Sequence, residues 1–365
     1  MDYSFDWIDA GRPTELSTWD EFVRFTPQGH YCGYSTWLQS FAVYGFDAEV
    51  LVAKALADGE IVGGLGIRFG YGPLKVAGGT VGPLVALGHE ALVPQLLERL
   101  SAWARDAGAA FVQIQLLSPA SRDEYEANEA GLLSSSASDG GGRLQAGRLL
   151  KAGLPSGYKN LVAQHPEIAG SDGDEAVLAT FPQSMRRNIR WAFRNVPAPY
   201  SAGDPSQIRE GYALIEVNGR EYGYATREWK DVESMLCAQV ERGQGELICV
   251  KVDGAVIASA CVLVAGSTMT HAMAGTKRLK PDLSAGAHVH WAAMRRAQGY
   301  YPSTLRYISQ DLKKREGREA LIPSRFAPQL RVKQRLGKGG GSQEGLSKGL
   351  ACVDFRLAPT KMSAF

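Results

Sequence analysis

The stretch EVLVAKALADGEIVGGLGIRFGYGPLKVAGG, residues 49–79, decides the fold of this chain. Two apolar runs meet at Asp58-Gly59, and a third apolar run follows a turn that contains glycine. Asp-Gly between two apolar runs is a strong hairpin signal, because glycine adopts positive φ without a steric penalty. The residues therefore predict three strands in an antiparallel meander.

The same pattern occurs again in ELICVKVDGAVIASACVLVAGSTMTHAMAG, residues 246–275, with its turn at Asp253-Gly254. Each copy is followed by an expected helix and a further strand. These elements are expected at residues 89–108 and 109–117 in the first copy, and at residues 284–299 and 305–309 in the second. Two copies of one α+β unit, each a mostly antiparallel sheet flanked by helices, could enclose a ligand site between them.

The chain has 365 residues, which is enough for two such units. We expect an N-terminal domain over residues 1–150 and a C-terminal domain over residues 151–365. The Ser/Gly-rich stretch 134–147 is expected to be an exposed loop at the joint, and residues 337–345 a second flexible stretch. An apolar segment at 350–358 is expected to form a closing strand.

Composition excludes several classes of protein. The formal net charge is +2, so an anion site must come from a local cluster of cations. The five cysteines form no C-x-x-C pair, and they indicate reduced core thiols rather than a zinc site. His288 and His290 stand two apart on an expected helix, so they point in different directions and do not suggest a metal pair. No metal site is therefore expected.

The N-terminal residues lack the basic and apolar regions of a signal peptide. No run approaches the ~18 apolar residues that a membrane span requires. We therefore expect a cytoplasmic protein without a membrane-spanning segment. The sequence gives no indication of the oligomeric state.

The segment SMRRNIRWAFRN, residues 184–195, is the richest in cations. Its arginines are Arg186, Arg187, Arg190 and Arg194. A packed face is expected from Met185, Ile189, Ala192 and Val196. The segment has no acidic partner at i+4, and every cation is an arginine, whose planar fork suits phosphate oxygens. Phosphate binding and a plain solvated helix face both fit this pattern.

A second cluster is GREYGYATREW, residues 219–229, in which Arg220 and Arg227 bracket Tyr222 and Tyr224. Interleaved cations and aromatic rings suit a nucleotide, a sugar or an adenosine end. A turn between two helices, with packed tyrosines, explains the same residues.

Two further candidates follow the second meander. The residues from Ser284 to Gly286 open a helix, whose free N–H groups and positive dipole end could hold an anion or a carbonyl. Lys333 could reach a transferred carbonyl or a ribose phosphate, or it could be a surface lysine. Gln334, Gly337 and Gly339 match the loop that holds coenzyme A pyrophosphate, but they do not open a helix after a strand.

The sequence contains no Ser-His-Asp or Cys-His arrangement, no Walker loop and no paired metal carboxylates. The candidate sites share cations and backbone N–H groups without a nucleophile. This fits direct transfer of an activated acyl group to an amine, which needs positioning and oxyanion stabilisation.

Taken together, these motifs resemble the Fem family of aminoacyl-tRNA-dependent transferases, which build peptidoglycan cross-bridges and consist of tandem domains of the GNAT acyltransferase fold. The likeness covers most of the chain. It is carried by TPQGHYCGYSTWLQS, which contains Trp37, by Gly82-Pro83, by SMRRNIRWAFRNV, by Arg220-x-x-Gly223-Tyr224-x-x-Arg227, by HVHWAAMRRAQG and by Val332-Lys333-x-x-Leu336-Gly337.

The resemblance implies roles for these residues. The second unit would carry the chemistry, with Lys333 stabilising the transferring carbonyl or the departing tRNA ribose. The arginine-rich helix would lie near the tRNA end, together with Ser284 and Gly286. The acceptor would contact a further group, which comprises Arg220, Tyr224, Arg227 and Trp37.

The chain departs from the family in two places. Phe41 stands where members that bind a nucleotide-sugar often have a lysine, and Tyr307-Ile308-Ser309-Gln310 replaces the usual Y-D-x-G. The acceptor could therefore be a cell-wall precursor, a small peptide or an amine-bearing antibiotic.

Three functions remain open at this point. The first is transfer of an aminoacyl group from aminoacyl-tRNA to an acceptor amine, with no cofactor beyond this co-substrate. The second is N-acyl transfer from acyl-CoA on the same fold. The third is binding of RNA or a nucleotide without catalysis.

Overall fold

The computed structural model describes residues 2–12, 14–70, 76–109, 111–117, 158–169, 174–179, 181, 183–223, 225–266, 268–300, 306–309 and 326–335. The expected flexible stretches 134–147 and 337–345, the expected strand 350–358 and the expected boundary at residue 150 lie outside these residues.

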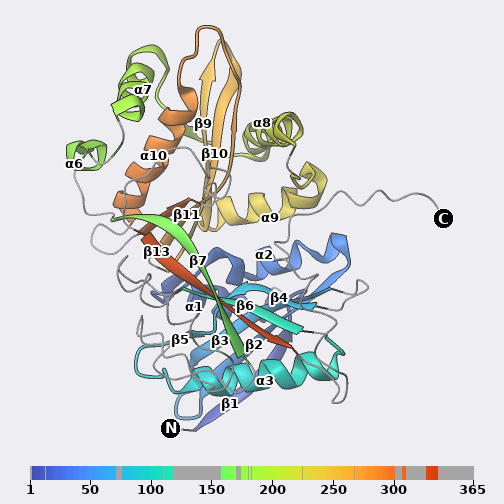
Figure 1. Cartoon of the computed structure of the whole chain (residues 1–365). Coiled ribbons are helices and arrows are strands. Elements are labelled where there is room, and N and C mark those ends of the chain that lie inside the picture. Colours follow the sequence, from blue (N-terminus) through green and yellow to red (C-terminus); the bar gives the residue numbers. More distant parts are fainter. Residues whose placement is uncertain are drawn as a thin grey trace, which may run out of the picture.

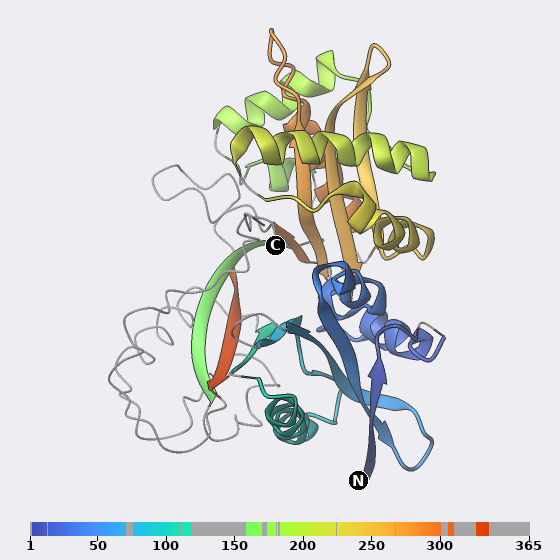
Figure 2. The same cartoon turned by 90° about the vertical axis from the view of Figure 1, so that its right-hand side faces the viewer.

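The strands join into one mixed sheet (Figures 1 and 2). Their order is β1-β2-β3-β4-β6-β13-β7-β12-β11-β10-β9-β8, and β5 pairs with β3 beside this path. The strands are β1 (Tyr3–Asp9), β2 (Phe46–Ala55), β3 (Ile61–Gly70), β4 (Val76–Val81), β5 (Leu84–Val85), β6 (Phe111–Leu117), β7 (Tyr158–Ala169), β8 (Tyr200–Ser201), β9 (Gly245–Val252), β10 (Ala255–Ala265), β11 (Thr268–Thr276), β12 (Arg306–Ser309) and β13 (Phe326–Arg335).

The helices cover this sheet. They are α1 (Ser17–Phe25), α2 (Ser35–Gln39), α3 (Leu92–Asp106), α6 (Asp174–Ala179), α7 (Gln183–Asn195), α8 (Pro205–Tyr222), α9 (Trp229–Glu241) and α10 (Ala285–Tyr300), with short 3₁₀ turns η1 (Tyr31–Gly33) and η2 (Ala42–Tyr44). We call β1 to β7, β13 and α1 to α3 the first unit, and β8 to β12 with α6 to α10 the second unit.

Both predicted meanders are present. β2, β3 and β4 pair antiparallel in the first unit, as do β9, β10 and β11 in the second. Asp253 and Gly254 both have positive φ, at 50° and 79°, which is the backbone of a tight two-residue hairpin. The expected helices and strands after each meander are also present, as α3 with β6 and α10 with β12.

The second unit buries both faces of its sheet (Figure 1). α8 and α9 lie against one face, where Tyr212, Leu236 and Leu263 are buried in one apolar cluster. α7 and α10 lie against the other face, where Ile189 and Val289 pack with further strand residues. Because both faces are covered, the exposed parts of this sheet are its strand edges and strand ends.

Two later strands, β7 and β13, complete the sheet of the first unit (Figure 2). β13 lies between β6 and β7 and is antiparallel to both. β7 is long enough to pair with β13 through Tyr158–Pro166 and with β12 through Glu167–Ala169, so it joins the two units. The expected division at residue 150 stays a prediction.

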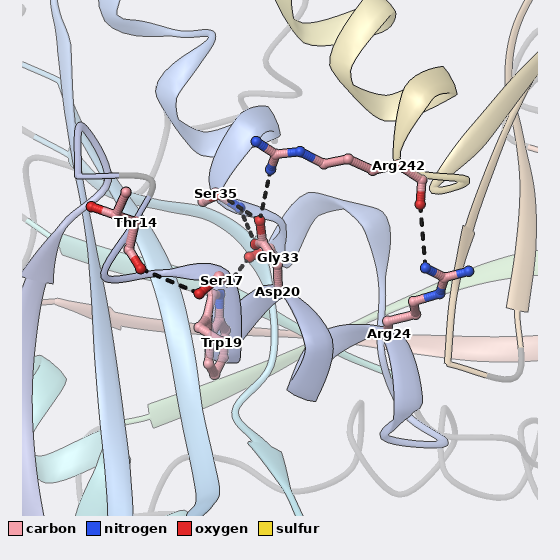
Figure 3. A network of polar contacts seen from close by, with 8 residues as sticks. All are labelled: Thr14, Ser17, Trp19, Asp20, Arg24, Gly33, Ser35 and Arg242. Atoms are coloured by element: carbon pink, nitrogen blue, oxygen red, sulfur yellow. Dashed lines mark hydrogen bonds and ion pairs between the residues drawn. The ribbon is translucent and has the colours of Figure 1, made fainter.

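The units also meet through a polar network around Asp20 on α1 (Figure 3). Its buried carboxylate accepts hydrogen bonds from the Ser35 N–H at 2.7 Å and the Ser35 hydroxyl at 2.6 Å. Arg242, after α9, reaches the same carboxylate at 3.4 Å, and its carbonyl accepts from Arg24 at 3.2 Å. Burial raises the pKa of Asp20 above its ordinary 3.8, against the lowering effect of Ser35 and Arg242.

Candidate functional site

Among the residues that the structure describes, the second unit has an open strand edge in the middle of its sheet. β12 runs parallel to β11 only over Thr268–His271, and the described pairing ends at His271 and Ser309. β11 itself continues to Thr276, still paired with β10 on its other side. Over the described residues, the part of β11 from Ala272 onward therefore presents one edge without a neighbouring strand.

A β-bulge lies where this edge opens. His271 is opposite Val262 and Met273 is opposite Cys261, so Ala272 is an extra residue in β11. A bulge interrupts the regular pairing and turns backbone groups out of the ladder, and bulges occur often beside active sites. The bulge and the end of the β12 pairing coincide, which marks this position as a candidate for binding a carbonyl oxygen through backbone N–H groups.

The direction of the next backbone groups follows from the ladder. The N–H of Lys277 donates to the Ile257 carbonyl of β10 at 2.8 Å. Hydrogen-bonded and non-hydrogen-bonded pairs alternate in an antiparallel ladder, so Thr276 and Ala274 direct their N–H and C=O groups to the open edge. A ligand at this edge would meet the backbone of Ala274.

The corresponding strands of the first unit differ. β6 runs parallel to β4 and pairs with it from Val76, opposite Phe111, to Gly78, opposite Gln113, and again at Val81, opposite Gln115, with a register shift between Gly78 and Val81. This pairing reaches the end of β4, so β4 offers no comparable open stretch among the residues described. The contrast favours the second unit as the place of the chemistry.

Exposed cations surround the end of β11 and the loop that follows it. We call this group the basic rim; its members are Arg187 and Arg194 of α7, Arg220 of α8, and Lys277, Arg278 and Lys280 of the loop. None of them forms an ion pair with a carboxylate among the described residues. Unneutralised cations on one end of a unit suit a ligand with several negative charges.

Aromatic contacts hold the loop between its two helices. The Arg278 guanidinium lies 5.2 Å from the centre of the Tyr222 ring, at the end of α8. On the other side, Trp191 of α7 donates to the Asp282 carbonyl at 3.1 Å. Phe193 meets His288 of α10 edge-on at 5.2 Å, so α7 lies against the first turns of α10.

The four arginines of α7 have different surroundings. Arg186 donates to the Ala179 and Phe181 carbonyls at 3.2 and 3.0 Å, which closes the end of α6. Arg190 forms an ion pair with Glu175 of α6 at 3.6 Å, a partner that the segment itself does not contain. Only Arg187 and Arg194 belong to the basic rim. The expected packed face is confirmed, since Ile189, Ala192 and Val196 are buried and Met185 packs against them.

Ser284 and Gly286 lie beside the end of β11, as the start of α10. The Ser284 carbonyl accepts from the N–H groups of Ala287 and His288, and the Ser284 N–H donates to the Asp282 carboxylate at 2.7 Å. A Cβ on Gly286 would come within 2.7 Å of the Thr276 hydroxyl. Close packing therefore accounts for the glycine, and Asp282 already occupies one helix N–H.

Arg227 is held by the protein itself. Its guanidinium donates to the Ser40 hydroxyl at 2.9 Å, to the Ser40 carbonyl, to the Asp231 carbonyl at 3.0 Å, to the Tyr44 hydroxyl at 3.4 Å and to the Met235 sulfur at 3.9 Å. These acceptors use all five N–H groups of an arginine. Arg227 thus ties the two units together, and acceptor binding by this residue stays a prediction.

The first-unit residues of the expected acceptor site form an aromatic cluster. Trp37 is half-buried and meets Tyr31 edge-on at 4.8 Å and Phe41 at 5.6 Å. Phe41 lies between two guanidinium groups, those of Arg68 at 3.8 Å and Arg227 at 4.6 Å. Burial lowers the pKa of Arg68 to about 10. Phe41 therefore has two cations within cation–π distance of its ring.

The remaining expected residues are separated from this cluster. Arg220 is exposed in the last turn of α8, which ends at Tyr222, and α9 begins at Trp229. Tyr224 lies outside the described residues. Lys333 is opposite Gln113 and Lys159 in the sheet of the first unit, a different strand from the open edge. Its role stays a prediction.

Sequence reasoning missed His271 on β11. Its ring meets His290 of α10 edge-on at 5.0 Å, and burial lowers its pKa to about 4, so it is neutral near pH 7. His288 instead contacts Phe193, which confirms that His288 and His290 point in different directions. No group of three or more His, Cys, Asp or Glu among the described residues could hold a metal ion. The described cysteines are free thiols.

The comparisons place this geometry in a class. Residues 180–306 match the family described as the acetyltransferase (GNAT) domain. This match supports an acyltransferase domain of the GNAT type in the second unit. The α+β fold with tandem GNAT units that the sequence predicted is confirmed.

One solved structure supports the same fold, and others are similar at lower TM-scores. The crystal structure of FemX is similar with a TM-score of 0.66 and 16% identity, covering 92% of this chain and 98% of that one. A conserved protein of unknown function from Bacteroides thetaiotaomicron VPI-5482 has a TM-score of 0.48 and 12% identity, with 92% and 100% covered. A tandem GNAT protein from the clavulanic acid biosynthesis pathway has a TM-score of 0.40 and 13% identity, with 93% and 100% covered.

No match is found among curated proteins. Of the helices in the described part of the chain, none combines the length and the apolar character needed to cross a bilayer.

Proposed function

We propose that the second unit transfers an aminoacyl group from aminoacyl-tRNA to the amine of a small acceptor. The acceptor is a short peptide, a peptidoglycan precursor or an antibiotic-type amine. The observation that carries the proposal is the open edge of β11, with its bulge at Ala272, directly followed by the basic rim.

The reaction needs little more than positioning. The carbonyl of the donor ester lies at the bulge, where backbone N–H groups of β11 stabilise the oxyanion. The acceptor amine attacks this carbonyl, a C–N bond forms and the ester C–O bond breaks. The amine loses a proton and the departing ribose oxygen gains one, directly or through water. An ester is already activated, so no covalent enzyme intermediate is required.

The basic rim supports a polyanionic donor. Its cations extend from α7 across the loop to the end of α8, further than a single phosphate group reaches. Trp191 and Phe193 are 40% and 46% exposed beside these cations and could stack on unpaired bases. The sequence resemblance to the Fem family supports the same donor.

Acyl-CoA is the second candidate donor. The family matched by residues 180–306 is described as an acetyltransferase domain, which favours an acetyl donor. Against it, the Asp282 carboxylate already accepts the Ser284 N–H at the start of α10, where a pyrophosphate would need free N–H groups.

The test is an amide-forming assay with a pool of charged tRNA and a panel of amine acceptors, run with and without RNase. We expect product that disappears when RNase is added first. Product that survives RNase and requires acyl-CoA would replace the donor in this proposal. RNA binding without product from any acceptor in the panel would favour a non-catalytic RNA-binding or nucleotide-binding protein.

A further inference from the structure

Asn218 of α8 occupies the place of a strand partner at the far end of the open edge. This buried side chain donates from Nδ2 to the Thr276 carbonyl at 3.1 Å and accepts from the Thr276 N–H at 2.8 Å through Oδ1. A carboxamide offers the same donor and acceptor as a peptide unit. Asn218 thus satisfies both backbone groups that Thr276 turns to this edge.

The position of Asn218 is fixed by the docking of α8. A Cβ on Gly275 would lie 2.6 Å from the backbone of Leu214 and Ile215, so helix and strand approach at backbone distance. The Ser259 hydroxyl also donates to the Gly211 carbonyl of α8 at 2.8 Å. Asn218 cannot leave Thr276 unless its rotamer changes within packed surroundings or α8 shifts as a whole.

Only a short stretch of edge is therefore left for a ligand. β12 ends its described pairing at His271, and Asn218 closes the edge at Thr276. Between them, Ala274 alone turns its N–H and C=O to this edge in the regular ladder. The next such residue, Thr276, lies two residues further, about 6.6 Å along the strand.

We propose that Asn218 determines donor specificity by limiting an extended ligand to one amide pairing at this edge. Extended chains bind open strand edges through consecutive amide groups. An aminoacyl ester offers its ester carbonyl to the strand and has no amide to place. A pantetheine arm has two amides in series, and the second would find Thr276 already occupied by Asn218. This inference rests on the proposed function, because it assumes that the donor binds along β11.

The experiment compares two probes of increasing length, N-acetylcysteamine with one amide and pantetheine with two. Their dissociation constants are measured by NMR titration on the wild type and on Asn218→Ala. The ratio of the two constants is expected to be near one in the wild type. In Asn218→Ala, pantetheine is expected to bind about fivefold tighter than N-acetylcysteamine, because one or two neutral hydrogen bonds to Thr276 become available.

Ser259→Ala is the matched control, since it removes another buried hydrogen bond between α8 and the sheet but leaves Thr276 paired. Its ratio is expected to equal that of the wild type. If Asn218→Ala does not fold, Asn218→Ser serves instead, because its side chain is too short to reach Thr276. The same fivefold preference is expected there.

Equal ratios in the wild type and the Asn218 variant would overturn the inference, and so would failure of both probes to bind the variant. The charged-tRNA assay separates this result from the proposed function. Transfer from tRNA with equal ratios removes the role of Asn218 and leaves the function. The expected shift in ratio without any transfer from tRNA keeps the role of Asn218 and removes the proposed function.

Discussion

Replacing Arg227 by alanine decides between a structural role and acceptor binding. The change removes five donors, which reach Ser40 and Tyr44 of the first unit and Asp231 and Met235 of the second. It also removes the guanidinium from the Phe41 ring, 4.6 Å away. Each bond contributes about 0.5–1.5 kcal/mol, and the site is partly exposed, so we expect a loss of about 3 kcal/mol in the free energy of unfolding. The melting temperature should fall by about 4 °C, since the entropy of unfolding grows with chain length.

Differential scanning calorimetry measures this change, and acceptor titrations in the transfer assay measure KM. Arg220→Ala is the control, since Arg220 is exposed in the same segment and should change stability by less than about 0.5 kcal/mol. Arg227→Lys should behave like the alanine variant, because an ammonium group cannot supply five fixed donors. Unchanged melting together with a large rise in the KM for the acceptor would refute the structural role.

Three further changes test other parts of the structure. The pKa of His271 is lowered from 6.5 to about 4, so the imidazole binds its proton at a lower pH in the folded form than in the unfolded chain. The free energy of unfolding should then keep this contribution in full above pH 6.5 and fall by about 3 kcal/mol toward pH 4. Urea unfolding at several pH values should show this fall in the wild type and not in His271→Phe. Gly286→Ala places a Cβ 2.7 Å from the Thr276 hydroxyl and should cost about 1–2 kcal/mol, most of which a second change, Thr276→Ala, should restore in a double-mutant cycle. Arg187→Ala with Arg194→Ala should lower the log–log salt slope of RNA binding by about 1.4; an unchanged slope would assign both arginines to a solvated face.

Local patterns predicted the elements of the fold well. The turn at Asp253-Gly254 has the positive φ values that Asp-Gly indicates, because the conformation depends on two adjacent residues alone. The packed face of α7 was also readable, since Ile189, Ala192 and Val196 recur at helical spacing and are buried. Each of these features is decided within one short segment of chain.

Pairing between distant segments could not be read in the same way. Glu175 neutralises Arg190, although the two belong to different helices. Nothing in residues 326–335 indicates that β13 returns to the sheet of the first unit. The contacts of Arg227 with Ser40 and Tyr44 likewise join residues that are far apart in the sequence.

The open edge of β11 belongs to the same class of features. It depends on where β12 stops and on Asn218, which comes from a helix some 58 residues earlier than Thr276. A single asparagine within a helical pattern carries no local signal of such a contact. The cation-rich motifs therefore indicate the neighbourhood of the proposed site, but they do not indicate the backbone groups of β11.

The most direct test of the account is amide hydrogen exchange with a stable donor analogue, an aminoacyl-adenosine in which an amide replaces the ester. We predict slower exchange in the peptide of β11 that contains Ala272 and Ala274, with no change in β4 of the first unit. Protection confined to the first unit, or none in β11 at saturating analogue, would contradict the assignment of the donor to the open edge.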